Sequence, residues 1–146
     1  MKVLLTGAAG FIGRATAEAL LKAGHQVVAV DNLNDYYAVS LKHARLATLR
    51  EQPGLQFYPL DVAHWPALDA LFAEQRPDAV IHLAAQAGVR YSIQNPHAYA
   101  QSNLLGMTHI LEACRQHPVQ HLVYASSSSV YGKNAKAPFA EDDRTD

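Results

Sequence analysis

The chain has 146 residues, of which 49% are hydrophobic and 17% are charged, and its formal net charge is −1. This length and apolar content suit one compact domain with a core of its own. The near-neutral charge gives no basic surface for a phosphate backbone, so we expect no nucleic-acid partner. No apolar run approaches the roughly 20 residues that a bilayer-spanning helix needs. The apolar run at the N-terminus breaks at Gly7, too early for a signal peptide.

The cysteine and histidine content excludes further classes of site. Cys114 is the only cysteine, so no internal disulfide is possible and a cytoplasmic setting is expected. The 8 histidines are scattered along the chain and form no ligand-like cluster. We therefore expect no metal site.

Apolar runs of strand length recur along the chain. Near-continuous runs of this kind are typical of strands that are covered on both faces. The expected strands are KVLLT (2–6), QVVAVD (26–31), LQFYPLDV (55–62), DAVIHLA (78–84) and HLVYAS (121–126).

Segments of helical period fill the intervals. The first helix is expected to end at Gly24. The apolar face expected for it comprises Ile12, Ala15, Ala19, Leu20 and Ala23. The second spans 40–50, and the third runs from Trp65-Pro66 to just before Pro77. The longest begins near Pro96, with an expected apolar stripe of Ala100, Leu104, Met107, Leu111 and Cys114.

Strict alternation of strand and helix predicts an α/β fold, a doubly wound parallel sheet with right-handed crossovers. We expect one domain over residues 1–146, with about five strands in the sheet. The residues after Asn134 lose the pattern and are expected to form a loop.

A glycine-rich segment joins the first strand to the first helix. GAAGFIG (7–13) reads Gly-x-x-Gly-x-x-Gly, which differs by one residue from Gly-x-Gly-x-x-Gly. Glycines here permit a tight turn and let the backbone approach a pyrophosphate, whose charge then meets the helix N-terminus. A tight turn without a ligand is the alternative.

Two carboxylates follow at strand ends. Asp31 closes the second strand, 18 positions after Gly13, where it can accept hydrogen bonds from a ribose diol. A 2′-phosphate would meet its negative charge, and no arginine in DNLND offsets that charge, which favours NAD over NADP. Asp61 can face the adenine edge, or it can merely cap its strand. With the glycines, these residues predict a Rossmann-type nucleotide-binding sheet.

Small and amide side chains follow the fourth strand. Ala84, Ala85 and Gly88 would let the backbone lie against a flat cofactor, although small residues also mark close packing. Asn103 lies beside the apolar stripe of the long helix, where bracing a loop is favoured over contacting a ligand. Arg90 could meet a substrate carboxylate or diphosphate, and a surface salt bridge is the alternative.

Four motifs in order, TGAAGFIG, DNLNDYY, HLAAQAGVRYS and YASSSSVYG, resemble the extended short-chain dehydrogenases/reductases of the nucleotide-sugar epimerase/dehydratase group. The wording of DNLNDYY and AAQAGVRYS looks most like UDP-glucuronate 4-epimerases. The resemblance covers all 146 residues.

The resemblance implies conversion of UDP-glucuronate to UDP-galacturonate by transient oxidation at C4 with bound NAD. A tyrosine phenolate would take the 4-hydroxyl proton, and Ser127 would hydrogen-bond the 4-oxygen, with Ser126 and Ser128 beside it. A homodimer that pairs through the long helix and a later one is also implied for the full-length protein. The implied cofactor-binding residues are Gly7, Gly10, Phe11, Ile12, Gly13, Asp31, Asn32, Asn34, Asp61, Val62, Leu83, Ala84, Ala85 and Asn103.

The serines also discriminate within the group. Related dehydratases carry an Asp-Glu pair at the positions of Ser128 and Ser129, and related decarboxylases carry a Glu at the second position. Elimination needs an acid and a base, and plain hydroxyls are poor at either task near neutral pH. The serines therefore favour oxidation and re-reduction at one carbon, although Ser126 or Ser129 is expected only to cap the strand end.

The base of the family, the tyrosine of Tyr-x-x-x-Lys, is missing from these residues. The residues four positions after the tyrosines are Ser40, Leu41, Val62, Asn95, Asn103, Ser128 and Ala135. The resemblance therefore implies the N-terminal part of an epimerase, a Rossmann-type sheet truncated after about five strands and without its sugar-binding domain, that binds NAD but cannot epimerise. Its fifth strand would be an open edge that invites association. The alternatives are a non-catalytic NAD-binding sensor and, less favoured, a nucleotide-sugar dehydratase or decarboxylase.

Overall fold

Five parallel strands form one sheet in the computed structural model, which describes residues 1–133 and 136–145. The strand order is β3-β2-β1-β4-β5, so the chain reverses direction across the sheet after β3. The strands are β1 (Lys2–Thr6), β2 (Gln26–Asp31), β3 (Leu55–Pro59), β4 (Ala79–His82) and β5 (His121–Tyr124). The α/β prediction of a doubly wound parallel sheet is therefore confirmed.

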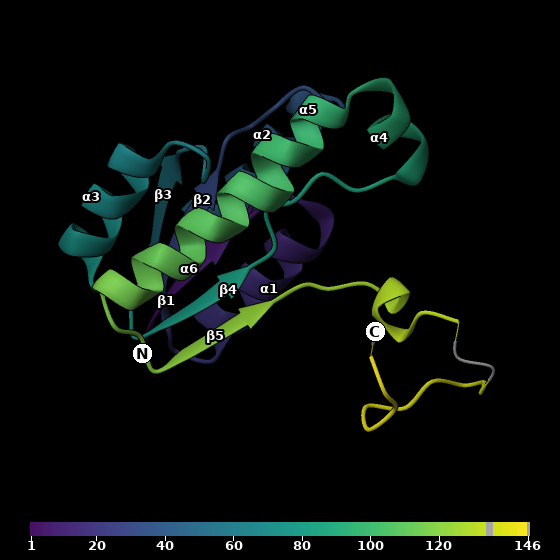
Figure 1. Cartoon of the computed structure of the whole chain (residues 1–146). Helices are drawn as coiled ribbons and strands as arrows, with labels where there is room; N and C mark the ends of the chain where they lie inside the picture. Colours follow the sequence, from purple (N-terminus) through teal and green to yellow (C-terminus); the bar gives the residue numbers. More distant parts are fainter. Residues whose placement is uncertain (134–135, 146) are drawn as a thin grey trace.

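Helices cover both faces of this sheet (Figure 1). The helices of the described residues are α1 (Phe11–Lys22), α2 (Val39–Arg50), α3 (Trp65–Gln75), α4 (Val89–Gln94), α5 (Pro96–Tyr99), the π-helix η1 (Ala100–Leu105), α6 (Gly106–Gln116) and the 3₁₀ helix η2 (Ser128–Tyr131). On one face, α3 and α6 pack Phe72 and Ile110 against Leu4 of β1. On the other face, α1 and α2 pack Ala17 and Leu49 near Leu5.

Three strands are shorter than the sequence predicted. β3 ends at Pro59, β4 at His82 and β5 at Tyr124. At the end of β4 the cause is local, because the N–H groups of Leu83 and Ala84 both donate to Thr6 Oγ1 at 3.1 Å. A side chain therefore takes the backbone donors that the sheet would otherwise use, and the chain leaves the sheet.

The predicted apolar face of α1 is wrong for Ile12, Ala15, Ala19 and Ala23, which are exposed, whereas Leu20 packs against the core as expected. Ile12 is 63% exposed, whereas Gly13 and Ala17 are buried. Gly13 lies directly on the turn before the helix, and a Cβ added there would lie 2.0 Å from the carbonyl oxygen of Gly7. That contact turns the side of α1 with the smallest residues toward the sheet and leaves Ile12 outside.

The predicted stripe of the long helix is wrong for Ala100, Leu104 and Leu111, which are exposed, whereas Cys114 packs against the core as expected. Leu104 is 70% exposed and Leu111 is 50% exposed, while Gly106, Ile110 and Ala113 are buried. The helix passes through the π-turns of η1, and a π-helix adds a residue to each turn. The added residues shift the phase of an α-helical pattern read through Ala100–Leu105.

The ends of the described chain agree with the sequence analysis in part. Residues 136–145 form neither helix nor strand, as expected for a loop, and residues 134 and 135 lie outside the described residues. Within the ranges that the structure describes, no helix is both long enough and apolar enough to cross a bilayer.

Candidate functional site

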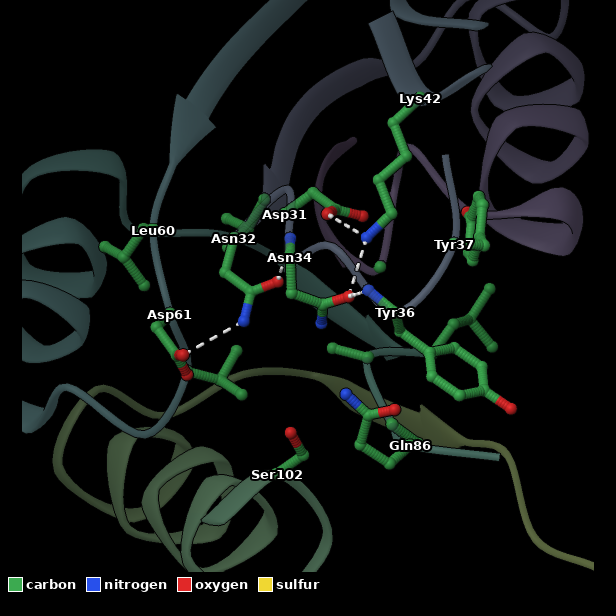
Figure 2. A pocket seen from close by; sticks show the side chains of 17 residues that line it. Asp31, Asn32, Asn34, Tyr36, Tyr37, Lys42, Leu60, Asp61, Gln86 and Ser102 are labelled. Atoms are coloured by element: carbon green, nitrogen blue, oxygen red, sulfur yellow. Dashed lines mark hydrogen bonds and ion pairs between the residues drawn. The ribbon is translucent and has the colours of Figure 1, made fainter. Parts of the chain in front are cut away.

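A pocket opens at the carboxyl ends of the strands, where ligands bind in open α/β sheets (Figure 2). Loops after β1, β2, β3 and β4 contribute to it, and Ser102 of η1 closes one side. Its lining residues are Gly7, Gly10, Val30, Asp31, Asn32, Asn34, Tyr36, Tyr37, Lys42, Leu60, Asp61, Val62, Leu83, Ala84, Ala85, Gln86 and Ser102.

The glycine turn forms the floor of the pocket. Gly7 has φ +69°, and a Cβ there would lie 2.8 Å from the backbone nitrogen of Ala84, so a side chain is excluded on two grounds. The fold itself therefore requires glycine at positions 7 and 13, as the prediction of a tight turn states. Gly10 is the N-cap of α1 and lines the pocket.

Backbone donors lie at the start of α1. The N–H groups of Phe11, Ile12 and Gly13 have no hydrogen-bond acceptor among residues 1–133 and 136–145. Unpaired donors at a helix N-terminus are suited to an anion such as a bridging phosphate. The side chain of Phe11 is 82% exposed and does not line the pocket.

Asp31 is held rigidly at the end of β2. Its Oδ2 accepts the N–H of Ala9 at 3.0 Å and its Oδ1 accepts the N–H of Leu33 at 2.9 Å. Each oxygen of a carboxylate has two lone pairs, so both retain acceptor capacity toward the pocket. The carboxylate is therefore pre-oriented to receive hydroxyl groups.

The loop after β2 is tied to the loop after β3. Asn32 donates from Nδ2 to Asp61 Oδ2 at 2.9 Å and accepts the N–H of Asn34 at 3.1 Å. Asp61 Oδ1 accepts the N–H of Ala63 at 2.8 Å. The side chain of Asp61 therefore orders the loop after β3 rather than the end of the strand itself, and it lines the pocket.

A buried histidine supports the loop after β4. Thr6 Oγ1 accepts two backbone N–H groups, as described above, so its single proton must be donated to His82 Nδ1, 2.7 Å away. His82 is thus neutral, with its proton on Nε2. Burial lowers the pKa of His82 from 6.5 to about 4.

Asn103 braces the same loop. Its Oδ1 accepts the N–H of Gln86 at 2.8 Å, and its Nδ2 donates to the carbonyl of Gln86 at 3.0 Å. This is the structural role that the sequence analysis favoured for Asn103. Its neighbour Ser102, which the sequence analysis did not select, lines the pocket.

Comparison with known proteins decides the family. Residues 3–146 match the NAD-dependent epimerase/dehydratase family. This chain belongs to that family.

Three similar proteins illustrate the match. An uncharacterized 37.6 kDa protein of Escherichia coli O111:H-, from the cld 5′ region, is 57% identical over all of this chain and 43% of its own length. A probable UDP-glucuronate 4-epimerase of Rhizobium meliloti (strain 1021) is 46% identical, with 100% of this chain and 43% of the relative covered. The solved structure of UDP-glucuronic acid 4-epimerase from Bacillus cereus with UDP-glucuronic acid and NAD has a TM-score of 0.87 and 35% identity, and the match covers 99% of this chain and 46% of that one.

The chain therefore spans less than half the length of these members of the epimerase/dehydratase family.

The structure does not place the serines of the family motif in the pocket lining. Ser126, Ser127 and Ser128 are exposed and follow the edge strand β5. Ser127 is the N-cap of η2 and its Oγ accepts the N–H of Ser129 at 3.3 Å. The side-chain oxygen that caps η2 therefore belongs to Ser127, whereas Ser126 or Ser129 was expected to cap the end of the strand.

Arg90 is exposed on α4, and no acidic side chain in the described ranges forms an ion pair with it. The predicted alternative, a surface salt bridge, is therefore not observed in those ranges. The guanidinium is free to meet an anion.

The pocket also contains residues that the sequence analysis missed. Tyr36, Tyr37 and Gln86 line it from loops, and Lys42 reaches it from α2. Lys42 is only 4% exposed, and its Nζ lies 3.8 Å from Asp31 Oδ1. No local signal identifies it, because a lysine within an amphipathic helix is ordinarily expected to face solvent.

His117 and His121 are four residues apart, a spacing that binds metal when both residues lie on one helix. In the structure, His117 is the C-cap of α6 and contacts Asp69 Oδ1 at 2.8 Å, whereas His121 begins β5. The two histidines therefore lie on different elements and do not form the helical metal-binding pair.

Proposed function

We propose that this chain is the NAD-binding part of a nucleotide-sugar 4-epimerase that converts UDP-glucuronate to UDP-galacturonate by transient oxidation at C4. The observation that carries the proposal is one pocket at the carboxyl edge of the sheet that is lined by a pre-oriented carboxylate, Asp31, and by Gly10, the N-cap residue that directly precedes the unpaired N–H donors of α1. The named relatives, two of which are UDP-glucuronate 4-epimerases, support the sugar specificity.

Each part of the coenzyme has a complementary group. The N–H groups at the start of α1 would bind the bridging phosphates, and Gly10 would let them approach. Asp31 would accept hydrogen bonds from the adenosine ribose, with Asn32 and Asn34 shaping the loop around it. Asp61 and Val62 would border the adenine, while Leu83, Ala84 and Ala85 would lie along the flat face of the cofactor.

The reaction itself needs more than this pocket. Bound NAD supplies the hydride acceptor, and in our proposal Ser127 hydrogen-bonds the sugar 4-oxygen, with Ser126 and Ser128 beside it. Arg90 is proposed to bind the substrate carboxylate or diphosphate. None of the tyrosines in the 146 residues has a lysine four positions later, so the proton of the 4-hydroxyl has no acceptor of the family type.

The first test is calorimetric titration of NAD into the purified chain and into the variant Asp31→Ala. Loss of hydrogen bonds to a charged group costs about 1.5–3 kcal/mol, so we expect NAD affinity to fall by about tenfold or more. Asp35→Ala is the matched control, because Asp35 is exposed and lies outside the pocket. Equal NAD affinities for the chain and the Asp31 variant would contradict the proposal.

One observation favours a second function, a non-catalytic NAD sensor, namely the absence of Tyr-x-x-x-Lys from the sequence. The two functions differ in whether the full-length protein binds and converts UDP-glucuronate. A sensor would bind NAD without affinity for UDP-glucuronate in any form of the protein, whereas a longer form of an epimerase containing Tyr-x-x-x-Lys would turn it over. Sequencing the gene beyond codon 146 and assaying its product separates them.

We also propose that the long helix contributes to a homodimer and that the protein works in the cytoplasm. Leu104 and Leu111 lie exposed along η1 and α6, and large apolar side chains gathered on one helix surface mark interaction sites. The single cysteine favours a reducing compartment.

A further inference from the structure

We propose that coenzyme choice is set by a buried ion pair, Asp31 with Lys42, and that Lys42 is a latent binding group for the 2′-phosphate of NADP. In this view Asp31 both receives the ribose diol and neutralises Lys42, the cation that forms an ion pair with it among the described residues. The inference rests on the NAD site proposed above and adds a specificity determinant to it.

The position of Lys42 has no explanation in the fold alone. It shares one face of α2 with the buried Leu46 and Leu49, at a place where an aliphatic residue would serve the core. It is also the fourth residue of its helix, near the N-terminal end whose partial positive charge disfavours a cation. Burying an ammonium there requires a compensating anion.

Asp31 is that anion. Lys42 Nζ lies 3.8 Å from Asp31 Oδ1 and 3.1 Å from Asn34 Oδ1, and it lies 4.9 Å from the ring centre of Tyr37 (Figure 2). The side chains of Lys42 and Asp31 are 5% and 7% exposed, respectively, so solvent screens this ion pair little. The pair therefore presents almost no net charge to the pocket.

The two partners are held independently. The carboxylate of Asp31 is oriented by the backbone N–H groups of Ala9 and Leu33, so it does not need Lys42 to stay in place. An ammonium has three donors, and in the described residues only Asn34 Oδ1 accepts from Lys42 within hydrogen-bond distance. Lys42 therefore retains donors that an incoming oxygen can use.

These facts predict a switch in specificity. With Asp31 present, a 2′-phosphate meets a carboxylate whose charge Lys42 only balances, and the neutral diol of NAD binds better. With a small neutral residue at position 31, the pocket gains both room and an unpaired cation. A phosphate then binds through charge-assisted hydrogen bonds to Lys42.

The test uses ADP-ribose and 2′-phospho-ADP-ribose, which differ only in the phosphate and need no nicotinamide contacts. Calorimetry compares the wild-type chain with Asp31→Ser, Lys42→Met and the double variant. We expect the wild type to prefer ADP-ribose by at least about tenfold. Asp31→Ser should bind 2′-phospho-ADP-ribose about tenfold more tightly than the wild type does, and the double variant should lose that gain.

Circular dichroism and thermal melting establish that each variant is folded. If Lys42→Met does not fold, Lys42→Gln in the Asp31→Ser background takes its place, since it also removes the charge. Equal affinity of the Asp31→Ser and double variants for 2′-phospho-ADP-ribose would overturn the role of Lys42, as would an unchanged preference in Asp31→Ser. A wild-type chain that binds neither probe would instead refute the proposed coenzyme site, and this inference with it.

Discussion

At the scale of single residues, the site depends on polar groups whose partners are fixed by counting donors and acceptors. Thr6 Oγ1 accepts two backbone N–H groups after β4 and donates its proton to His82, so His82 is a neutral acceptor. His82 therefore supports the loop of Leu83 and Ala84 from within the sheet. A proton added to its Nδ1 would destroy this arrangement.

The free energy of unfolding should therefore depend on pH through His82. Its pKa is about 4 in the folded chain and 6.5 in the reference state, so the unfolded chain binds more protons between these values. The stabilisation is complete above pH 6.5 and falls by on the order of 3 kcal/mol as pH drops to 4. Urea denaturation at a series of pH values measures this. His82→Asn keeps an acceptor without titrating, and parallel pH profiles for the two proteins would contradict the assignment.

At the scale of elements, two helices are turned differently from what their apolar patterns predict, and each has a local cause. In α1, contact between Gly13 and Gly7 sets the rotation of the helix on the sheet. In the long helix, the π-turns of η1 change the phase of the α-helical pattern that placed Leu104 on the apolar stripe. Close backbone packing and an irregular turn therefore outweighed the burial of the larger side chains.

Two glycine-to-alanine substitutions separate steric from conformational effects on these elements. Gly13→Ala places a methyl group 2.0 Å from the carbonyl oxygen of Gly7, and this oxygen belongs to backbone that cannot easily move away. We expect a loss of about 3 kcal/mol or more in unfolding free energy. Gly24→Ala has no atom within 4 Å and suffers only from φ +80°, so about 1 kcal/mol is expected. Chemical denaturation compares them, and equal losses would argue against the steric control of α1.

At the scale of the whole molecule, the described sheet ends at the edge strand β5, and the serines that follow it are exposed. The pocket in which we propose that the coenzyme binds is built from segments before β5. Coenzyme binding and sugar chemistry are thus separable in this chain. The first requires only the observed pocket, and the second requires a base that the sequence does not contain.

Incubation of the 146-residue chain with NAD and UDP-glucuronate should therefore give no UDP-galacturonate. A phenol with an ordinary pKa near 10 cannot replace the tyrosine of Tyr-x-x-x-Lys near neutral pH. Chromatography of the sugar nucleotides measures turnover, and a parallel NAD titration verifies that the pocket is intact. Clear turnover would refute this prediction.

Self-association tests the proposed dimer face. Leu104→Glu with Leu111→Glu should weaken association by placing charges where apolar contact is expected, which sedimentation measures over a range of concentrations. Leu41→Glu on α2 is the control, because Leu41 is similarly exposed, at 45%, but lies on another helix. An equal effect of both changes would point to nonspecific association.

The strand-helix alternation, the glycine turn and the carboxylates that follow the strands were predictable from the 146 residues alone. These depend on local backbone conformation and on the rule that parallel strands end at one edge of a sheet. The buried faces of the helices and the ion pair between Lys42 and Asp31 became visible only in the folded chain. Both depend on how closely segments far apart in the sequence approach each other, and that distance is not encoded in any local pattern.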